Sequence, residues 1–247
     1  EKVKEARQTP FEVAFSAFEF DAVDCLAPRR GRSPSSDNAL GTMSIMEYNG
    51  SAVVAMTGKN CVAIASDTRM GAQALTVATN QERVFKMNNK TLLGLSGLIS
   101  DVYTVQQKLA MQVNMYKLRE NRDMKPTVFN NMLSSFLYAR RFGPYFVEPV
   151  VAGLEGPDNK PFISGQDLLG AAVFTDDFVV AGTSESELFG TCESFYKPNL
   201  EPEELFETIS QCMLAAVDRD CLAGWGGVVH ILTPTEHIVK HLKGRHD

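Results

Sequence analysis

The sequence lacks the features that mark several large classes of protein. No apolar run in its 247 residues approaches the roughly 18 residues of a membrane-spanning helix, so we expect none. The N-terminal region has no continuous apolar centre of a secretory signal, and its acidic residues argue against a transit peptide. A formal net charge of −6 gives no basic face for nucleic acid or for a membrane surface.

Cysteine and histidine are both scarce. The 5 cysteines form no C-x-x-C pair and are odd in number, which is typical of reduced thiols in the cytoplasm or nucleus. His237, His241 and His246 are the candidate ligands for a metal site, but solvated histidines of a C-terminal tail are the favoured interpretation. We therefore expect no cofactor and no metal.

The composition divides the chain into two parts. Residues 1–42 contain the polar, breaker-rich run from Pro28 to Asn38, so we expect a disordered leader there. Residues 43–247 carry the periodic apolar patterns and are long enough for a single domain with a sizeable core.

Apolar alternation and turn signals predict a largely antiparallel strand content. The turn signals include Thr57-Gly58-Lys59-Asn60, Asn88-Asn89 and Gly156-Pro157-Asp158-Asn159. The expected strands span residues 52–56, 61–66, 83–87, 91–95, 147–154, 162–167, 170–174, 178–181, 228–232 and 237–242.

Helical spacing predicts four helices between these strands. The first spans residues 100–120 behind a Ser100-Asp101 cap, and the third spans 185–194. The second and fourth begin at Pro126 and Pro202, and Gly224 is the expected stop of the last. Blocks of strands and helix pairs in this order favour an α+β fold, a four-layer αββα sandwich.

One constellation has the composition of an active site. Gly50 precedes Ser51, the alternating run from Ala52 ends in Ser66-Asp67-Thr68-Arg69, and Asp218-Arg219-Asp220 stands far downstream. A hydroxyl nucleophile at a chain terminus can use its own freed α-amine, with a pKa of about 7.7–8, as the base. A lysine, orienting acids and hydroxyls, and backbone N–H groups would assist it. Cleavage after glycine, which has no side chain to block attack, would release that amine.

These residues resemble the beta subunits of the 20S proteasome, which are N-terminal-nucleophile hydrolases when active. The resemblance runs from Tyr48 to the end and includes residues 141–153, 175–183, 206–211 and 217–220. It implies the αββα fold of that family. It also implies partners: neighbouring beta subunits in a seven-membered ring, and alpha-ring subunits. By position, the family's functional residues fall on Ser51 (nucleophile), Arg83 (lysine), Thr183 (serine), Asp67 (acid after the first hairpin), Asp220 (acid on the last long helix) and Ala223 (second serine).

The departures from the family pattern indicate a vestigial site. Serine for threonine keeps a hydroxyl, but the Arg83 guanidinium has a pKa above about 12 and cannot shuttle a proton. Ala223 removes an orienting hydroxyl, and losses within one catalytic unit are strongly non-additive. Without cleavage after Gly50, the Ser51 nitrogen is an amide and no base is present. The resemblance therefore implies a non-catalytic beta subunit of the eukaryotic 20S core particle, which supports ring assembly and protein degradation by sister subunits.

Two alternatives remain at this point. One is a serine-type peptidase of the same family that cleaves itself after Gly50 and acts through Ser51. The other is an alpha-ring subunit, which the Gly50-Ser51 junction disfavours.

The residues of the constellation also have structural interpretations. We expect Asp67 and Arg83 to form a buried ion pair. Asp220 is expected to cap its helix or to accept from nearby N–H groups, and Gly226-Gly227 to permit close strand approach.

Two residue types suggest subunit contacts. Met111 and Met115 lie opposite the apolar stripe of the first helix, so they are candidates for an interface or for packing against the second helix. Trp225 is interpreted as a core or subunit contact rather than as a ligand platform.

Overall fold

The structure is a computed structural model and describes residues 44–246. The chain divides into two units, Glu1–Gly41 and Thr42–Asp247, and the fold below is that of the second unit. The predicted leader, residues 1–42, lies outside the described residues. None of the helices within residues 44–246 is long and apolar enough to cross a membrane.

The first of the two large sheets has the strand order β10-β1-β2-β11-β12, and every pair in it is antiparallel. The predicted hairpin between its first two strands is confirmed, with Asn60 in the left-handed region at φ 54°. The strands of this sheet are β1 (Ala52–Gly58), β2 (Cys61–Asp67), β10 (Phe178–Gly182), β11 (Gly227–Leu232) and β12 (His237–Leu242).

The second large sheet has the order β5-β6-β7-β8-β9 and is also antiparallel throughout. Its strands are β5 (Val84–Asn88), β6 (Thr91–Gly97), β7 (Val147–Glu155), β8 (Lys160–Gln166) and β9 (Ala172–Thr175). A small hairpin that the sequence pattern did not predict, β3 (Met70–Ala72) and β4 (Leu75–Ala78), stands apart from both sheets.

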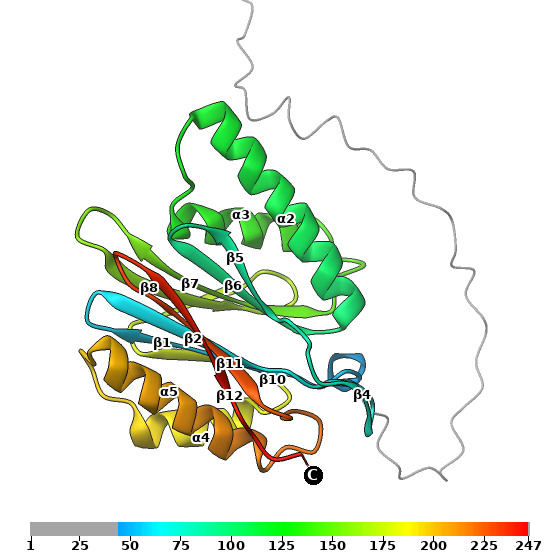
Figure 1. The fold of residues 1–247 in the computed structure, drawn as a ribbon. Coiled ribbons are helices and arrows are strands. Elements are labelled where there is room, and N and C mark those ends of the chain that lie inside the picture. Colours follow the sequence, from blue (N-terminus) through cyan, green and yellow to red (C-terminus); the bar gives the residue numbers. More distant parts are fainter. Residues whose placement is uncertain (1–43, 247) are drawn as a thin grey trace, which may run out of the picture. The chain divides into compact units, whose positions relative to one another are not determined.

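The four predicted helices are present. They are α2 (Ile99–Glu120), α3 (Pro126–Tyr138), α4 (Glu185–Phe195) and α5 (Pro202–Val217), and a short 3-10 turn, η1 (Ile45–Glu47), precedes them. Figure 1 shows α2 and α3 beside one sheet and α4 and α5 beside the other.

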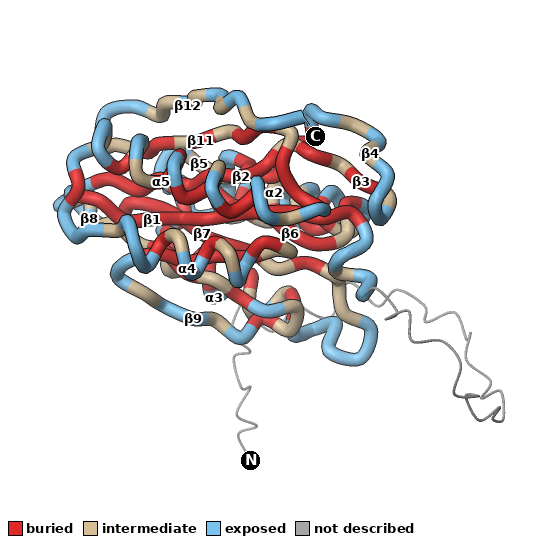
Figure 2. The backbone as a smooth tube through the Cα atoms, turned by 90° about the horizontal axis from the view of Figure 1, so that it is seen from below, coloured by how far each residue is buried: buried red, intermediate tan, exposed pale blue. Residues whose placement is uncertain are grey.

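Three apolar cores separate four layers, so the predicted αββα sandwich is confirmed. Val54 of β1 packs with Leu205 and Ile209 of α5, whereas its neighbour Val53 packs with Leu92 of the opposite sheet. A third core joins the outer face of the second sheet to α2 and α3. Side chains alternate between the faces of a strand, so a strand covered on both faces needs an unbroken apolar run. β1 is buried along its whole length accordingly (Figure 2).

The predicted helix starts were right for the prolines and wrong for the first cap. Pro126 and Pro202 each occupy the first turn of their helices. At α2, however, the N-cap is Leu98, which makes no side-chain cap, and Ser100 lies inside the helix. The Asn49 carboxamide oxygen accepts from the Ile99 amide at 3.0 Å instead. A residue distant in sequence thus satisfies an amide that a local cap would ordinarily satisfy.

The predicted stop of the last helix was also wrong. Helix α5 ends at Val217, and the chain then turns through Asp218 to Asp220 before it reaches Gly224. Gly224 has φ +130°, and its amide donates to Asp67 Oδ2 at 3.2 Å. This glycine therefore belongs to the candidate site rather than to a helix terminus.

Candidate functional site

The candidate site begins where the chain enters β1. Gly50 has φ +65°, a conformation that L side chains rarely adopt, and a Cβ there would lie 2.0 Å from the Leu222 carbonyl oxygen. The close approach of these two backbone segments therefore requires a glycine. This is a packing reason for the residue, independent of any cleavage after it.

Ser51 is fully buried and its backbone is fixed on both sides. Its amide donates to Thr183 Oγ1 at 3.2 Å, and its carbonyl oxygen accepts from the Thr183 amide at 2.8 Å. The Ser51 hydroxyl accepts from the Gly97 amide at 3.4 Å, which is the only hydrogen bond found for it among the described residues. No basic group within residues 44–246 is therefore positioned to take the proton of this hydroxyl.

The predicted buried pair of Asp67 and Arg83 is confirmed. Arg83 Nε donates to Asp67 Oδ1 at 2.9 Å, and both side chains are completely buried. Arg83 Nη2 also donates to the Gly50 carbonyl oxygen at 2.7 Å and to the Arg69 carbonyl oxygen. One guanidinium thus joins three separate backbone and side-chain segments, a task for which its planar fork is suited.

The Arg83 contact with Gly50 bears directly on chemistry. It places the positive charge of the guanidinium next to the Gly50 carbonyl oxygen, which belongs to the peptide bond that self-cleavage would break. A charge in that position can stabilise an oxyanion. It cannot act as a base, because a guanidinium stays protonated in proteins. Arg83 can therefore stabilise an oxyanion at Gly50, but it cannot take the proton of the Ser51 hydroxyl.

Opposing effects act on the pKa of the Asp67 carboxyl group. Complete burial raises the pKa of its carboxyl group. The charge of Arg83 and the amides of Ala52 and Gly224 oppose that rise, since each favours the carboxylate. Oδ1 thus accepts from Ala52 and Arg83, and Oδ2 accepts from Gly224. These bonds connect β2 to β1 and to the loop at Gly224.

A second buried cation lies beside the first. Arg69 is 2% exposed, and within residues 44–246 its guanidinium is held by carbonyl and hydroxyl oxygens, with no carboxylate in ion-pair contact. It donates to the Leu222 carbonyl at 2.5 Å, to Thr76 Oγ1 at 2.9 Å and to the Gln73 carbonyl at 3.1 Å. It therefore fastens the β3–β4 hairpin to the loop that follows α5.

Asp220 lies in the loop after α5, not on the helix as the resemblance implied. Its Oδ2 accepts from Thr183 Oγ1 at 2.7 Å and from Ser184 Oγ at 2.5 Å, and its Oδ1 accepts from the Leu222 amide at 2.9 Å. The expected bond to a neighbouring N–H group is confirmed and the helix cap is not. Sequence reasoning missed Ser184, although a second hydroxyl adjacent to Thr183 was visible in the sequence.

Ala223 occupies the position at which the family pattern has a hydroxyl. The residue is 6% exposed and belongs to the apolar core beneath α4 and α5. An alanine there contributes to packing and makes no side-chain hydrogen bond, so the network ends at Asp220.

A hollow of about 390 Å³ lies next to this constellation. Its lining includes Thr183, and four carboxylate residues contribute to it, namely Glu47, Glu148, Glu185 and Asp220. Burial, followed by the charge of Glu148, raises the pKa of Glu185. Among the described residues no lysine, arginine or histidine lines this hollow, so it provides no cationic proton shuttle.

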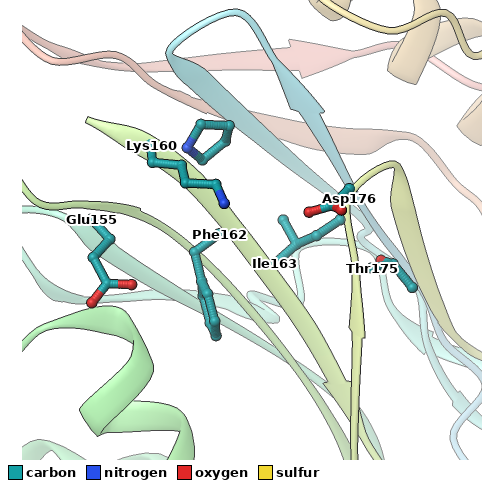
Figure 3. A pocket seen from close by; sticks show the side chains of 7 residues that line it. Glu155, Lys160, Phe162, Ile163, Thr175 and Asp176 are labelled. Carbon is teal, nitrogen blue, oxygen red and sulfur yellow. The ribbon is translucent and has the colours of Figure 1, made fainter. Parts of the chain in front are cut away.

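A smaller hollow of about 100 Å³ lies elsewhere, at the ends of β8 and β9 (Figure 3). Glu155, Lys160, Phe162 and Asp176 are among the residues around it. None of the predicted site residues lines this hollow, so it plays no part in the constellation.

The remaining candidates predicted from the sequence lie outside the constellation. Within residues 44–246 no group of three His, Cys, Asp or Glu residues is arranged to hold a metal. His246 instead lies with its ring 5.5 Å from that of Trp225, which is half-buried. Gly226 and Gly227 approach backbone atoms closely, as expected: a Cβ would be 2.9 Å from the Leu242 oxygen and 3.1 Å from the Ser66 oxygen.

Comparisons with known proteins match most of the described chain. A family model with the description "Proteasome subunit" matches residues 47–232. The chain is similar to "Proteasome subunit beta type-3" of Dictyostelium discoideum, at 57% identity over 205 residues, which is 83% of this chain and 100% of the relative. With the same coverage, the identity is 59% to "Proteasome subunit beta type-3" of Oryza sativa subsp. japonica. It is 55% to "Probable proteasome subunit beta type-3" of Schizosaccharomyces pombe.

Proposed function

The chain belongs to the proteasome subunit family, and we infer from this premise that it works as a non-catalytic beta subunit of the 20S core particle. Its similarity to several type-3 beta subunits along their whole length supports that position within the family. Its work is structural: it holds neighbouring subunits in register while sister subunits cleave peptide bonds.

The single observation that carries the inactive assignment is the surroundings of Ser51. A nucleophilic hydroxyl needs a base, and as long as Gly50 stays joined to Ser51 the nitrogen of Ser51 is an amide, which donates to Thr183 and cannot act as one. The neighbouring cation is Arg83, which cannot exchange its proton at neutral pH. We therefore interpret the constellation as a buried hydrogen-bonded network that holds the surrounding segments together but does not catalyse peptide-bond cleavage.

The exposed surface of α2 supports assembly with other subunits. Met111, Met115 and Leu118 follow one another at helical spacing and are 52%, 43% and 79% exposed. Neither methionine belongs to the core between the second sheet, α2 and α3, and exposure of this extent favours the interface interpretation. The proposed partners are the neighbouring beta subunits of a seven-membered ring and subunits of the alpha ring.

Two further expectations belong to this proposal. Reduced thiols suit the cytoplasm and nucleus, and three of the four described cysteines are buried as thiols. The chain is proposed to consist of a leader, residues 1–42, and one domain, residues 43–247. The 205-residue extent of the matched relatives agrees with the length of that domain.

The test is the intact mass of this subunit released from the assembled complex. A mass that includes residues before Ser51 means that no free α-amine exists and supports the non-catalytic assignment. A mass that begins at Ser51 favours a self-processed serine peptidase. Comparison with a Ser51→Ala subunit then separates self-cleavage, which the substitution abolishes, from cleavage by a neighbour, which it leaves intact.

A further inference from the structure

A pair of histidines outside the constellation contact each other across two neighbouring strands. His230 Nδ1 of β11 and His237 Nε2 of β12 are 3.1 Å apart, with ring centroids 5.3 Å apart and planes inclined by 19°. Both side chains are half-buried, so the pair is shielded but reachable from solvent. The function proposed above uses neither residue.

The strand register explains why these two rings meet. In the β11–β12 ladder His230 lies opposite Val239, and His237 lies opposite Leu232. The alternate residues Val229, Ile231 and Ile238 pack into the core beneath α5. Since side chains alternate between faces, His230 and His237 share the other face, at a diagonal of the ladder.

The separation of the two nitrogens suits a shared metal ion. Imidazole nitrogens bind zinc at about 2.0–2.1 Å, so two of them lie roughly 2.9 Å apart at a right angle and roughly 3.4 Å apart at the tetrahedral angle. The observed 3.1 Å lies between these limits. We propose that His230 and His237 form a two-histidine clamp for a divalent transition metal, Cu²⁺ or Zn²⁺, with water in the remaining positions.

The protonation change that binding requires is small. In the hydrogen-bonded pair one of the facing nitrogens carries a proton and the other accepts it. For both to bind a metal, that proton moves to the other nitrogen of its own ring, and the two lone pairs turn toward one point. Two neutral imidazoles are present before and after, so no net proton is lost.

The surroundings set the expected strength and selectivity. Lys86 of β5 and His241 of β12 are the charged or titratable groups that act electrostatically on the pair, and a lysine charge opposes any cation. Two protein ligands also hold a metal less tightly than three. Cu²⁺ is expected to bind more tightly than Zn²⁺, because affinity at nitrogen sites follows that order.

The experiment is a titration of the metal-free full chain with Cu²⁺ or Zn²⁺ alone. Calorimetry gives the affinity, and electron paramagnetic resonance of the Cu²⁺ form reports the bound nitrogens. A Cys221→Ser background removes the one cysteine that is exposed within residues 44–246, because its thiol would otherwise compete for either metal. His230→Gln and His237→Gln test the clamp, and His246→Gln, which removes a histidine beside Trp225, is the matched control.

We expect one equivalent of Cu²⁺ bound through two nitrogens, with an affinity that falls at least tenfold in either clamp variant and stays unchanged in His246→Gln. Circular dichroism establishes that each variant is folded. His237→Gln is the less disruptive of the two substitutions, because His237 begins the edge strand β12. Absence of binding in the parent chain overturns the proposal. So does binding that survives both substitutions, which would identify an adventitious ion elsewhere on the surface.

Discussion

Replacing Arg83 by methionine is expected to destabilise the chain severely. The substitution keeps an unbranched side chain of similar reach but removes the charge and every hydrogen bond of the guanidinium. Asp67, which is 0% exposed, then retains only the amides of Ala52 and Gly224 as donors among the described residues. Breaking a buried ion pair by removing one partner costs about 3–5 kcal/mol, because the other charge is left buried and uncompensated.

Urea unfolding measures this effect. With an m-value of about 3 kcal/mol per molar, the upper part of the usual range, the midpoint of Arg83→Met should fall by roughly 1–1.7 M. The matched control is Arg122→Met. Arg122 forms an ion pair with Glu120 on the surface, where both side chains are about half or more exposed. Its loss should leave the midpoint unchanged within error.

A double variant identifies the cause of the loss. Asp67→Asn combined with Arg83→Met removes the uncompensated charge while the carboxamide oxygen still accepts from Ala52. We expect the double variant to be more stable than the sum of the two single losses predicts. Strict additivity, or a loss below about 1 kcal/mol for Arg83→Met alone, would refute the view that this pair is a structural joint.

Two further outcomes test the packing of the site and the state of the thiols. Gly50→Ala should lower the melting temperature at least twice as far as Gly156→Ala. Both glycines have positive φ, but a Cβ meets Leu222 only at the first and open space at the second. The expected loss at Gly156 is about 2–4 °C, and equal losses would contradict the packing argument. Burial, followed by the charge of Glu201, raises the pKa of Cys61 to about 11, whereas Cys221 is exposed. At a pH of about 8.5 iodoacetamide should therefore modify Cys221 in the folded chain and Cys61 only after unfolding, as peptide mapping would show; equal labelling would argue against the burial.

Residues at the catalytic positions of the family have a structural role in this chain. Asp67 and Arg83 each connect segments that are far apart in sequence, and most of their partners are backbone groups. Backbone partners depend on position rather than on residue type, so these contacts survive the substitutions that remove chemistry. The fold therefore has a physical reason to keep Asp67 when the lysine and the second hydroxyl of the family pattern are absent.

The sequence by itself determined the strands of the two large sheets, the four helices and the identity of the main buried pair. The apolar runs of β1 and β2 and the prolines at the starts of α3 and α5 are local signals, so they could be interpreted without knowledge of neighbours. The αββα layering followed from their order. Asp67 and Arg83 were found because the family resemblance brought two distant positions together.

Only the tertiary structure decided which distant groups share hydrogen bonds. Asn49 supplies the oxygen for the first amide of α2, and Arg69 is neutralised by no carboxylate within residues 44–246 but is held by carbonyl groups. His230 meets His237 because of the register of one ladder. None of these contacts has a local pattern, since each depends on where two backbones pass in space. Periodicity in a sequence specifies which face of an element is buried, and the packed chain specifies what that face meets.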